Sequence, residues 1–338
     1  MTVNLVANPG NKFFCRVCNK APLCIKEGLC YFNNNYFKEV AGKSAEFPER
    51  SYNVSTTEVI RPFDPWKSKQ CTCPPKFSLN PYTGCSYGCL YCYITSFIPS
   101  AFNLREKKDL IKRVLKDLNS IPEGALIAMS NSSDPYPEIE KEKCLTREIL
   151  KILKERGFRV IITTKGNIVI RDIDILREMK GAIAITITTF DDDISDKLEP
   201  FAPKPFKRLE VLKEARKAKI PASLRLDPLI PGITDSKENI RDVIGRCANY
   251  IDQVITSTFK PRPDSLKRVI KAFPESGEKL SSLLSSKIGN SYYLSKELRL
   301  NLIELVRKEA IRYNLAFSSC REDFSYLNTA ICDGSAKL

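Results

Sequence analysis

Three cysteines, Cys85, Cys89 and Cys92, follow one another in a Cys-x3-Cys-x2-Cys pattern. An iron–sulfur cluster is usually held by four thiolates. A loop that supplies three leaves one iron open to another ligand, as catalytic metal sites do. Gly84 and Gly88 let the backbone wrap closely around a cluster. The spacing therefore predicts a 4Fe–4S cluster with an open iron. A structural zinc ion is the alternative, but structural zinc sites have four ligands and commonly show two Cys-x2-Cys pairs, which this motif does not.

The remaining cysteines suggest further metal sites. The chain has 13 cysteines, and two of those outside the first group, Cys144 and Cys247, are interpreted as small core residues. The other eight fall into two sets that each match a four-thiolate site. The first set is Cys15, Cys18, Cys24 and Cys30, and the second is Cys71, Cys73, Cys320 and Cys332. Either set suits an auxiliary iron–sulfur cluster or a zinc ion, although Cys71 and Cys73 as spare thiols stay an alternative.

The amino-acid composition excludes some catalytic mechanisms and favours one kind of partner. The chain of 338 residues contains no histidine, which excludes Ser-His-Asp catalysis and mixed Cys/His zinc sites. A formal net charge of +14, from 54 basic and 40 acidic residues, favours a polyanionic partner such as nucleic acid. The alternative is that these basic residues only cover helix faces exposed to solvent. We find no long apolar run and no signal peptide, so a cytoplasmic protein without a membrane segment is expected.

The chain divides into four predicted regions. Residues 1–50 form a Cys-rich, metal-binding module, because the segment is too poor in apolar residues to fold alone. Residues 51–76 are a connector. Residues 77–260 alternate short β-branched runs with helical runs, which predicts an α/β domain with a parallel sheet. Residues 261–338 form a mostly helical C-terminal extension that carries possible auxiliary cluster ligands.

The alternating region predicts successive β/α units. Strands are expected over 125–129, 158–164, 182–189, 221–227 and 250–256, with helices over 145–156, 173–179, 205–219 and 237–249. One further strand before Cys85 makes six, which fits a partial (β/α)6 barrel. The extension should contain a helix over 295–313 and a strand over 315–318. Chemistry in such barrels lies at the carboxyl ends of the strands, where the cysteine loop and several polar residues are expected.

The cysteine motif, with Tyr91 directly before the third cysteine, resembles the motif of the radical S-adenosylmethionine (radical SAM) superfamily. The resemblance implies an open (β/α)6 barrel. It also implies that SAM binds the open iron, and that one electron from the cluster splits SAM to give a 5′-deoxyadenosyl radical. An external low-potential electron donor is then required.

Further motifs, in order along the chain, look like the branch related to spore photoproduct lyase. They are Asn80-Pro81-Tyr82, Ser133-Asp134-Pro135-Tyr136, Thr164-Lys165, Arg171-Asp172-Ile173-Asp174, Leu198-Glu199-Pro200 and Pro231-Gly232. In that branch the serine of the Ser-Asp pair, the lysine and a fourth-strand hydroxyl contact SAM. The resemblance therefore implies SAM contacts by Ser133, Lys165 and Thr186. The full set expected around SAM is Tyr91, Tyr93, Ser132, Ser133, Asp134, Thr164, Lys165, Thr186 and Arg225.

One position departs from the branch pattern. Photoproduct lyases carry a cysteine hydrogen donor three residues before the Asp, where this chain has Asn131. A thymine-dimer lyase reaction is therefore not expected. The leading hypothesis is a radical SAM enzyme that acts on a nucleic-acid base, in RNA modification or DNA repair. The alternatives are a peptide- or protein-modifying radical SAM enzyme with auxiliary clusters, and a non-catalytic, zinc-stapled nucleic-acid-binding protein. The oligomeric state is left open.

Overall fold

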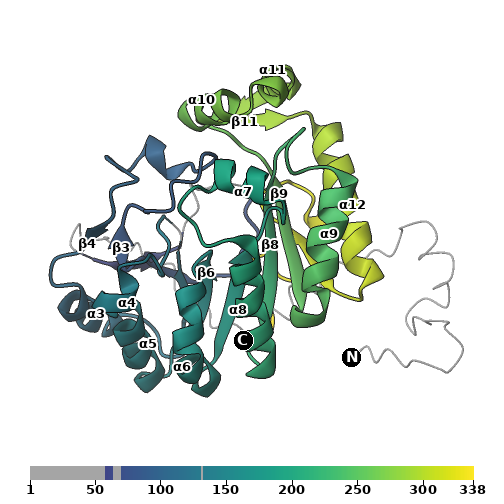
Figure 1. Ribbon diagram of the computed structural model, residues 1–338. Coiled ribbons are helices and arrows are strands. Elements are labelled where there is room, and N and C mark those ends of the chain that lie inside the picture. The colour runs from purple at the N-terminus through teal and green to yellow at the C-terminus, as the bar shows by residue number, and fades with distance from the viewer. Residues whose placement is uncertain (1–57, 64–69, 131) are drawn as a thin grey trace, which may run out of the picture. The chain divides into compact units, whose positions relative to one another are not determined.

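One eight-stranded sheet organises the protein, with the strand order β1-β2-β5-β6-β7-β8-β9-β12 (Figure 1). The computed structural model describes residues 58–63, 70–130 and 132–338, all within a unit that spans Asn53–Leu338. The strands are β1 (Ile60–Pro62), β2 (Phe77–Leu79), β5 (Leu126–Met129), β6 (Arg159–Thr164), β7 (Gly181–Thr186), β8 (Ala222–Leu229), β9 (Gln253–Thr258) and β12 (Ala316–Ser319). β1 pairs antiparallel with β2, and every other neighbouring pair is parallel.

The partial barrel predicted from the sequence is confirmed. The six expected strands are β2 and β5 to β9, and their bounds lie within a few residues of the prediction. Two strands extend the sheet beyond those six, because β1 adds to one edge and β12 pairs in parallel with β9 at the other. β1 and β12 are thus the two edges of the sheet in the part of the chain that the structure describes.

Helices connect the strands and cover the outer side of the sheet (Figure 1). They are α3 (Leu110–Leu118), α4 (Glu140–Lys143), α5 (Leu145–Glu155), α6 (Ile173–Glu178), α7 (Asp192–Leu198), α8 (Pro205–Lys217), α9 (Lys237–Cys247) and α12 (Lys296–Arg312). Local sequence explains several helix starts. The side chains of Asp191, Ser236 and Ser295 each accept a hydrogen bond from the third backbone amide that follows, as N-cap residues do. Pro205 occupies the first turn of α8, where its missing amide costs nothing.

The C-terminal extension is only partly helical. Besides α10 (Pro263–Ala272), α11 (Pro274–Leu283) and α12, it forms a two-stranded hairpin of β10 (Leu284–Ile288) and β11 (Ser291–Leu294) that the sequence did not predict. α10 contacts α7 and the short 3₁₀ helix η1 (Ile94–Ser96), which follows the cysteine loop. The extension therefore reaches the end of the sheet where the cysteine loop lies.

The inner face of the sheet is apolar near the amino ends of the strands. Leu126, Ala128, Ile161, Ala182 and Ala184 form a cluster that contains no helix residue. The final residue, Leu338, packs against this cluster. Since side chains alternate along a strand, Thr186 follows Ala182 and Ala184 on the same inner face of β7. The C-terminal segment thus fills the inside of the partial barrel below Thr186.

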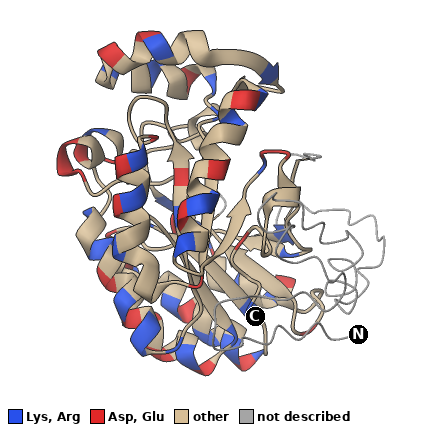
Figure 2. Ribbon diagram, turned by 90° about the vertical axis from the view of Figure 1, so that its right-hand side faces the viewer, with Lys and Arg blue, Asp and Glu red and all other residues tan. Residues whose placement is uncertain are grey.

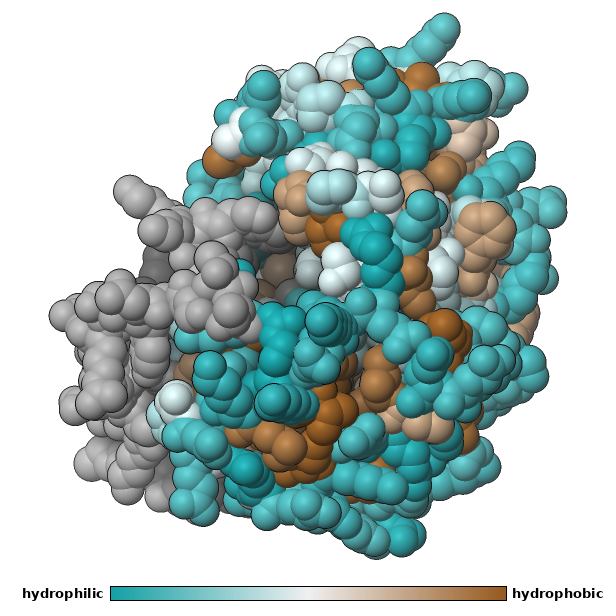
Figure 3. Space-filling model, turned by 90° about the vertical axis from the view of Figure 1, so that its left-hand side faces the viewer, coloured by the Kyte–Doolittle hydropathy of each residue, from teal (hydrophilic) through white to brown (hydrophobic). Residues whose placement is uncertain are grey.

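The surface carries mixed charge. Lys and Arg alternate with Asp and Glu along the outer helices on the face shown in Figure 2, so the excess of 14 positive charges does not form one uniform basic face there. The face in Figure 3 is mostly hydrophilic, with apolar side chains exposed in its central part. Among the described residues, no helix has the length and apolar character needed to cross a membrane.

Candidate functional site

The cysteine loop follows β2 and is closely packed. Gly84 and Gly88 both have positive φ angles, of 77° and 64°. A Cβ atom on Gly84 would lie 2.7 Å from the carbonyl oxygen of Asn103, and one on Gly88 would lie 3.0 Å from the ring of Phe201. Any side chain at Gly84 would therefore collide with backbone, in a conformation that L-residues rarely adopt. The two glycines fix the path of the loop, as the sequence predicted.

The three thiols of the loop lie close enough to interact electrostatically. Burial, followed by the nearby carboxylate of Asp134, raises the pKa of Cys85 to about 12. Burial likewise raises the pKa of Cys89 to about 12 and that of Cys92 to about 11. The backbone amides of Tyr87 and Asp134 donate hydrogen bonds to the Cys85 sulfur. A cluster fits this donor set, because three buried thiols and sulfur-directed amides suit thiolates bound to metal, and binding would release their protons.

Asp134 ties the loop after β5 to the end of β6. Its carboxylate accepts hydrogen bonds from the Thr164 hydroxyl at 2.5 Å, from the Lys165 backbone amide at 2.8 Å and from the Tyr136 amide at 2.9 Å. Burial raises the pKa of Asp134, although these three hydrogen bonds oppose the shift. Asp134 therefore positions Lys165 through its backbone amide, and the lysine side chain lies within electrostatic range of the same carboxylate.

The Lys165 ammonium lies between the cysteine loop and the buried carboxylate of Glu199. It is 3.9 Å from Glu199 and 5.4 Å from the centre of the Tyr91 ring. Burial opposes its charge, but Cys89 and Glu199 outweigh burial and leave the pKa of Lys165 raised. A buried ammonium beside a cluster is suited to bind a carboxylate ligand.

Glu199 and Arg208 are site residues to which the sequence analysis gave no role. Glu199 accepts a hydrogen bond from the Tyr91 hydroxyl and forms an ion pair with Arg208. Burial opposes ionisation of Glu199, yet Arg208 and Lys165 hold its pKa below the usual range. Arg208, from α8, also donates to the backbone oxygen of Thr186 at 3.1 Å. This pair thus connects the residue before Cys92 with the end of β7.

Arg268 of α10 clamps the cysteine loop from the C-terminal extension. Its guanidinium donates to the backbone oxygens of Leu90 at 3.0 Å and Cys92 at 2.7 Å. Asp264, one helical turn earlier, holds Arg268 at 3.1 Å. No local pattern marks Arg268, because its partners lie more than 170 positions earlier in the sequence.

The other residues expected around SAM differ in their burial and in their partners. Ser133 and Thr186 are buried beside the inner face, whereas Ser132 is only partly buried and donates its amide to Asn80 at 3.0 Å. Arg225 pairs with Asp227 at 2.6 Å. Tyr93, next to Cys92, lies within electrostatic range of Arg225 and Asp227. Arg225 therefore belongs to an internal ion pair with Asp227.

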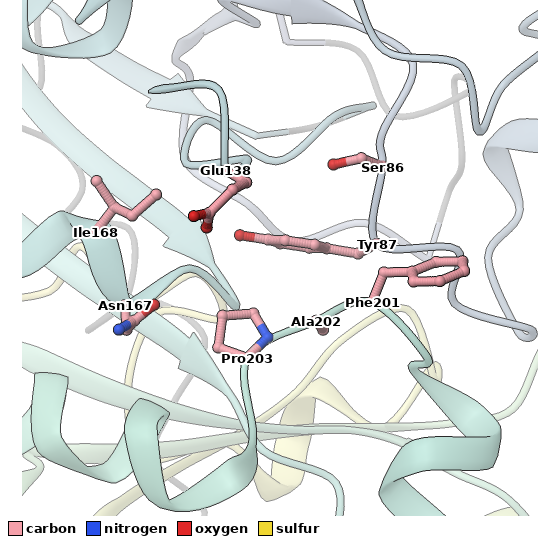
Figure 4. Close-up of a pocket in the computed structure, with 8 residues that line it drawn as sticks. All are labelled: Ser86, Tyr87, Glu138, Asn167, Ile168, Phe201, Ala202 and Pro203. Atoms are coloured by element: carbon pink, nitrogen blue, oxygen red, sulfur yellow. The ribbon is translucent and has the colours of Figure 1, made fainter. Parts of the chain in front are cut away.

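A cavity of about 470 Å³ lies beside the cysteine loop, lined by Ser86, Tyr87, Glu138, Asn167, Ile168, Phe201, Ala202 and Pro203. Figure 4 shows the Tyr87 ring extending across it toward Glu138. Ser133, Lys165 and Thr186 do not line this cavity, so we do not assign it to SAM.

The structure places the remaining cysteines in different surroundings. Cys15, Cys18, Cys24 and Cys30 lie outside the described residues, as does Asn131. Cys247 is fully buried in α9, as expected. The interpretation of Cys144 as a core residue is wrong, because it is only half-buried at the junction of α4 and α5 and contacts Arg171 at 3.3 Å. The last set comes together in the fold and comprises Cys71, Cys73, Cys320 and Cys332.

Comparison with known proteins defines the class. Residues 79–244 match the model of the Radical SAM superfamily, and this span contains the cysteine loop and the network around Lys165. The chain therefore carries a radical SAM domain, the domain of a superfamily of enzymes. The resemblance found in the sequence is confirmed.

Individual relatives add detail. The chain is 34% identical over 165 residues to an uncharacterized protein of Methanocaldococcus jannaschii, covering 47% of this chain and 62% of that protein. It is 27% identical to an uncharacterized protein of Acidianus two-tailed virus, covering 70% and 81%, and 23% identical to a radical SAM Nα-GlyT isomerase of Pseudomonas phage M6, covering 72% and 53%. The match thus spans less than two thirds of the first and last of these relatives.

Among solved structures, the fold is similar to that of spore photoproduct lyase. A mutant of that enzyme with bound AdoMet and dinucleoside spore photoproduct superposes with a TM-score of 0.58 at 16% identity. The superposition covers 75% of this chain and 78% of the lyase. At this identity the comparison supports the overall fold and does not assign a substrate.

Proposed function

We propose that this protein cleaves SAM at a 4Fe–4S cluster held by Cys85, Cys89 and Cys92. One electron from the reduced cluster, supplied by an external low-potential donor, would split SAM and yield a 5′-deoxyadenosyl radical. The observation that carries the proposal is the position of the buried Lys165 ammonium beside Cys89, next to the cysteine loop of a radical SAM domain.

The residues around the cluster have separate tasks in this proposal. Lys165 binds the carboxylate of SAM. Ser133 and Thr186 offer hydroxyl groups from neighbouring strand ends. Asp134 positions Lys165 through its backbone amide, and Glu199 keeps the lysine charged. Tyr91, held by Glu199, closes the cluster loop against the ammonium and excludes water.

Replacing Lys165 by methionine should weaken SAM binding about 10- to 150-fold, since it removes one charge-assisted hydrogen bond of about 1.5–3 kcal/mol. Calorimetry or equilibrium dialysis on the reconstituted protein measures this. Iron content should stay unchanged. Lys204→Met is the matched control, because Lys204 pairs with Asp196 at the exposed surface. Equal SAM affinity of Lys165→Met and the unaltered protein would remove Lys165 from the site.

The proposed substrate is a base of a nucleic acid. The spore photoproduct lyase with a similar fold binds a dinucleoside lesion. In this chain, Phe97, Phe102 and Phe201 are exposed near the cysteine loop, and the first two carry arginines over their rings, from Arg262 at 5.7 Å and Arg268 at 5.4 Å. Exposed aromatic rings with nearby cations are suited to stack an unpaired base. A base inside a duplex would have to be flipped out first. Since position 131 is an asparagine, this chain lacks a thiol hydrogen donor there, and we do not propose thymine-dimer repair.

The interface can be tested by binding to single-stranded RNA and DNA. Phe201 is 73% exposed, and loss of one base–aromatic stack costs about 1–3 kcal/mol. Phe201→Ala should therefore weaken binding about 5- to 150-fold, as measured by fluorescence anisotropy. Tyr313→Ala is the control, because exposed Tyr313 ends α12 at the opposite end of the sheet. The logarithm of the affinity should also fall with the logarithm of salt, by about 0.7 per neutralised phosphate on a single strand. Absence of saturable binding at low salt would remove the nucleic-acid substrate.

A further inference from the structure

Four cysteines outside the cysteine loop converge at the gap between the two edges of the sheet, and they are Cys71, Cys73, Cys320 and Cys332. Cys71 and Cys73 lie in the connection between β1 and β2, at one edge, and Cys320 directly follows β12, at the other. The Cys73 and Cys332 sulfurs are 3.3 Å apart although 259 positions separate them in the sequence. The thiol of Cys71 hydrogen-bonds to Cys73, and Cys320 lies within electrostatic range of Cys71, Cys73 and Cys332.

Surrounding contacts hold these thiols in place. Lys76 and Asp333, each close to one of the cysteines in the sequence, form an ion pair whose side chains are 3% and 8% exposed. The amide of Cys320 donates to the oxygen of Thr256 at 2.8 Å. The Gln253 side chain holds the oxygen of Ile331, next to Cys332, at 2.7 Å. The arrangement is therefore built from both edges of the sheet and from the C-terminal segment inside the barrel.

Cations balance part of the charge that four thiolates would carry. Lys76 lies in electrostatic range of Cys73 and Cys332. Arg225 hydrogen-bonds to the Cys320 side chain, and Lys260 donates to the Cys320 oxygen at 3.3 Å. Asp333 and Asp227 pair with Lys76 and Arg225, so the acidic groups nearby are themselves neutralised. A site with four thiolates and one divalent ion carries two negative charges. The nearby cations can offset this charge.

The spacing of the sulfurs distinguishes one ion from a cluster. Zinc–sulfur bonds of about 2.3 Å in a tetrahedron place neighbouring sulfurs roughly 3.8 Å apart. The sulfurs of Cys73 and Cys332 need to separate by only about half an ångström to reach this. An iron–sulfur cube places sulfide and iron between its thiolates and needs a wider arrangement.

We propose that Cys71, Cys73, Cys320 and Cys332 bind one Zn²⁺ through four thiolates and thereby fasten the open edges of the partial barrel to each other. Within the described residues, no three Cys, His, Asp or Glu side chains already surround a common metal position. The same is true of the cysteine loop. In both places the thiols lie near one another, and they move into coordinating positions when the metal binds. Binding releases the protons of the thiols and involves no change of oxidation state.

The test measures zinc and iron in the full-length protein, purified without oxygen. Cys15→Ser and Cys18→Ser are introduced first, so that the other four-cysteine set does not contribute zinc. In this background, Cys73→Ser with Cys332→Ser should lower zinc by one equivalent per chain and leave iron unchanged. Cys144→Ala is the matched control and should keep both metals. A loss of about four irons instead of zinc would identify a cluster, and unchanged zinc and iron would remove the site.

A second measurement does not depend on the folding of the variants. Co²⁺ added to the metal-free Cys15→Ser, Cys18→Ser protein, in which the four proposed ligands are intact, should give the intense visible bands of tetrahedral cobalt–thiolate, and one equivalent of Zn²⁺ should remove them. Mass spectrometry on protein alkylated without prior reduction reports the competing state. A Cys73–Cys332 disulfide in the anaerobically purified protein, together with the absence of the cobalt bands, would overturn the proposal.

Discussion

Cys89→Ala abolishes SAM cleavage and the bound 4Fe–4S cluster, according to the proposed function. Cys89 is buried beside Lys165 and Glu199, and in that proposal it supplies, with Cys85 and Cys92, the thiolates that hold the cluster. Two thiolates do not replace three, so iron should fall to background and 5′-deoxyadenosine should drop below detection. Iron analysis, visible absorbance of the reconstituted protein and chromatography of the products measure these effects.

Cys247→Ala is the matched control for this result. Cys247 is as buried as Cys89, but it lies in α9, on the outer side of the sheet. Its replacement removes a buried sulfur and leaves the cysteine loop intact, so cluster content and SAM cleavage should be retained. If Cys89→Ala kept both the iron and the cleavage, the assignment of the loop to the cluster would be wrong.

Glu199→Ala should destabilise the fold by about 3–5 kcal/mol, because it leaves the Arg208 guanidinium buried without its carboxylate. Both side chains are almost fully buried, at 0% and 1% exposed. The same change frees Tyr91 and removes the carboxylate near Lys165, so SAM binding should weaken as well. Urea unfolding of the cluster-free protein, followed by circular dichroism, gives the change in the free energy of unfolding.

A double variant separates lost charge pairing from lost packing. Glu199→Leu combined with Arg208→Met replaces the buried ion pair by apolar side chains of similar length, which is often neutral or stabilising. The double variant should recover at least half of the stability lost in Glu199→Ala. A single variant that loses less than about 1 kcal/mol would show that Arg208 finds water or another partner, and that the pair does not hold the site together.

The fold followed from the sequence where the signals are local. Pro205 at the start of α8 and the alternation of short β-branched runs with helices predicted the β/α units to within a few residues. The hairpin of β10 and β11 and the edge strand β1 were not predicted. Their three- to five-residue runs carry weak periodicity, and their pairing depends on neighbours that a local pattern does not reveal.

The candidate site divides in the same way. The cysteine loop and the Asp134–Lys165 contacts belong to short motifs, so the resemblance located them. Glu199 belongs to the Leu198-Glu199-Pro200 motif, but its role depends on buried contacts that the tertiary fold creates. The same is true of Arg208 and Arg268, whose charge alone does not distinguish them from surface residues. The second cysteine set was grouped by elimination. Its convergence depends on the parallel register of β12 against β9, which places Cys320 at the gap.

Production of 5′-deoxyadenosine from SAM, under anaerobic reducing conditions, is the decisive measurement for the proposed radical chemistry. The reconstituted protein is incubated with SAM alone and with total cellular RNA, DNA or protein, beside Cys89→Ala. We predict cleavage by the unaltered protein, stimulated by a nucleic-acid fraction and not by the protein fraction, and none by the variant. Formation of 5′-deoxyadenosine at the level of Cys89→Ala under every condition would contradict the proposed function.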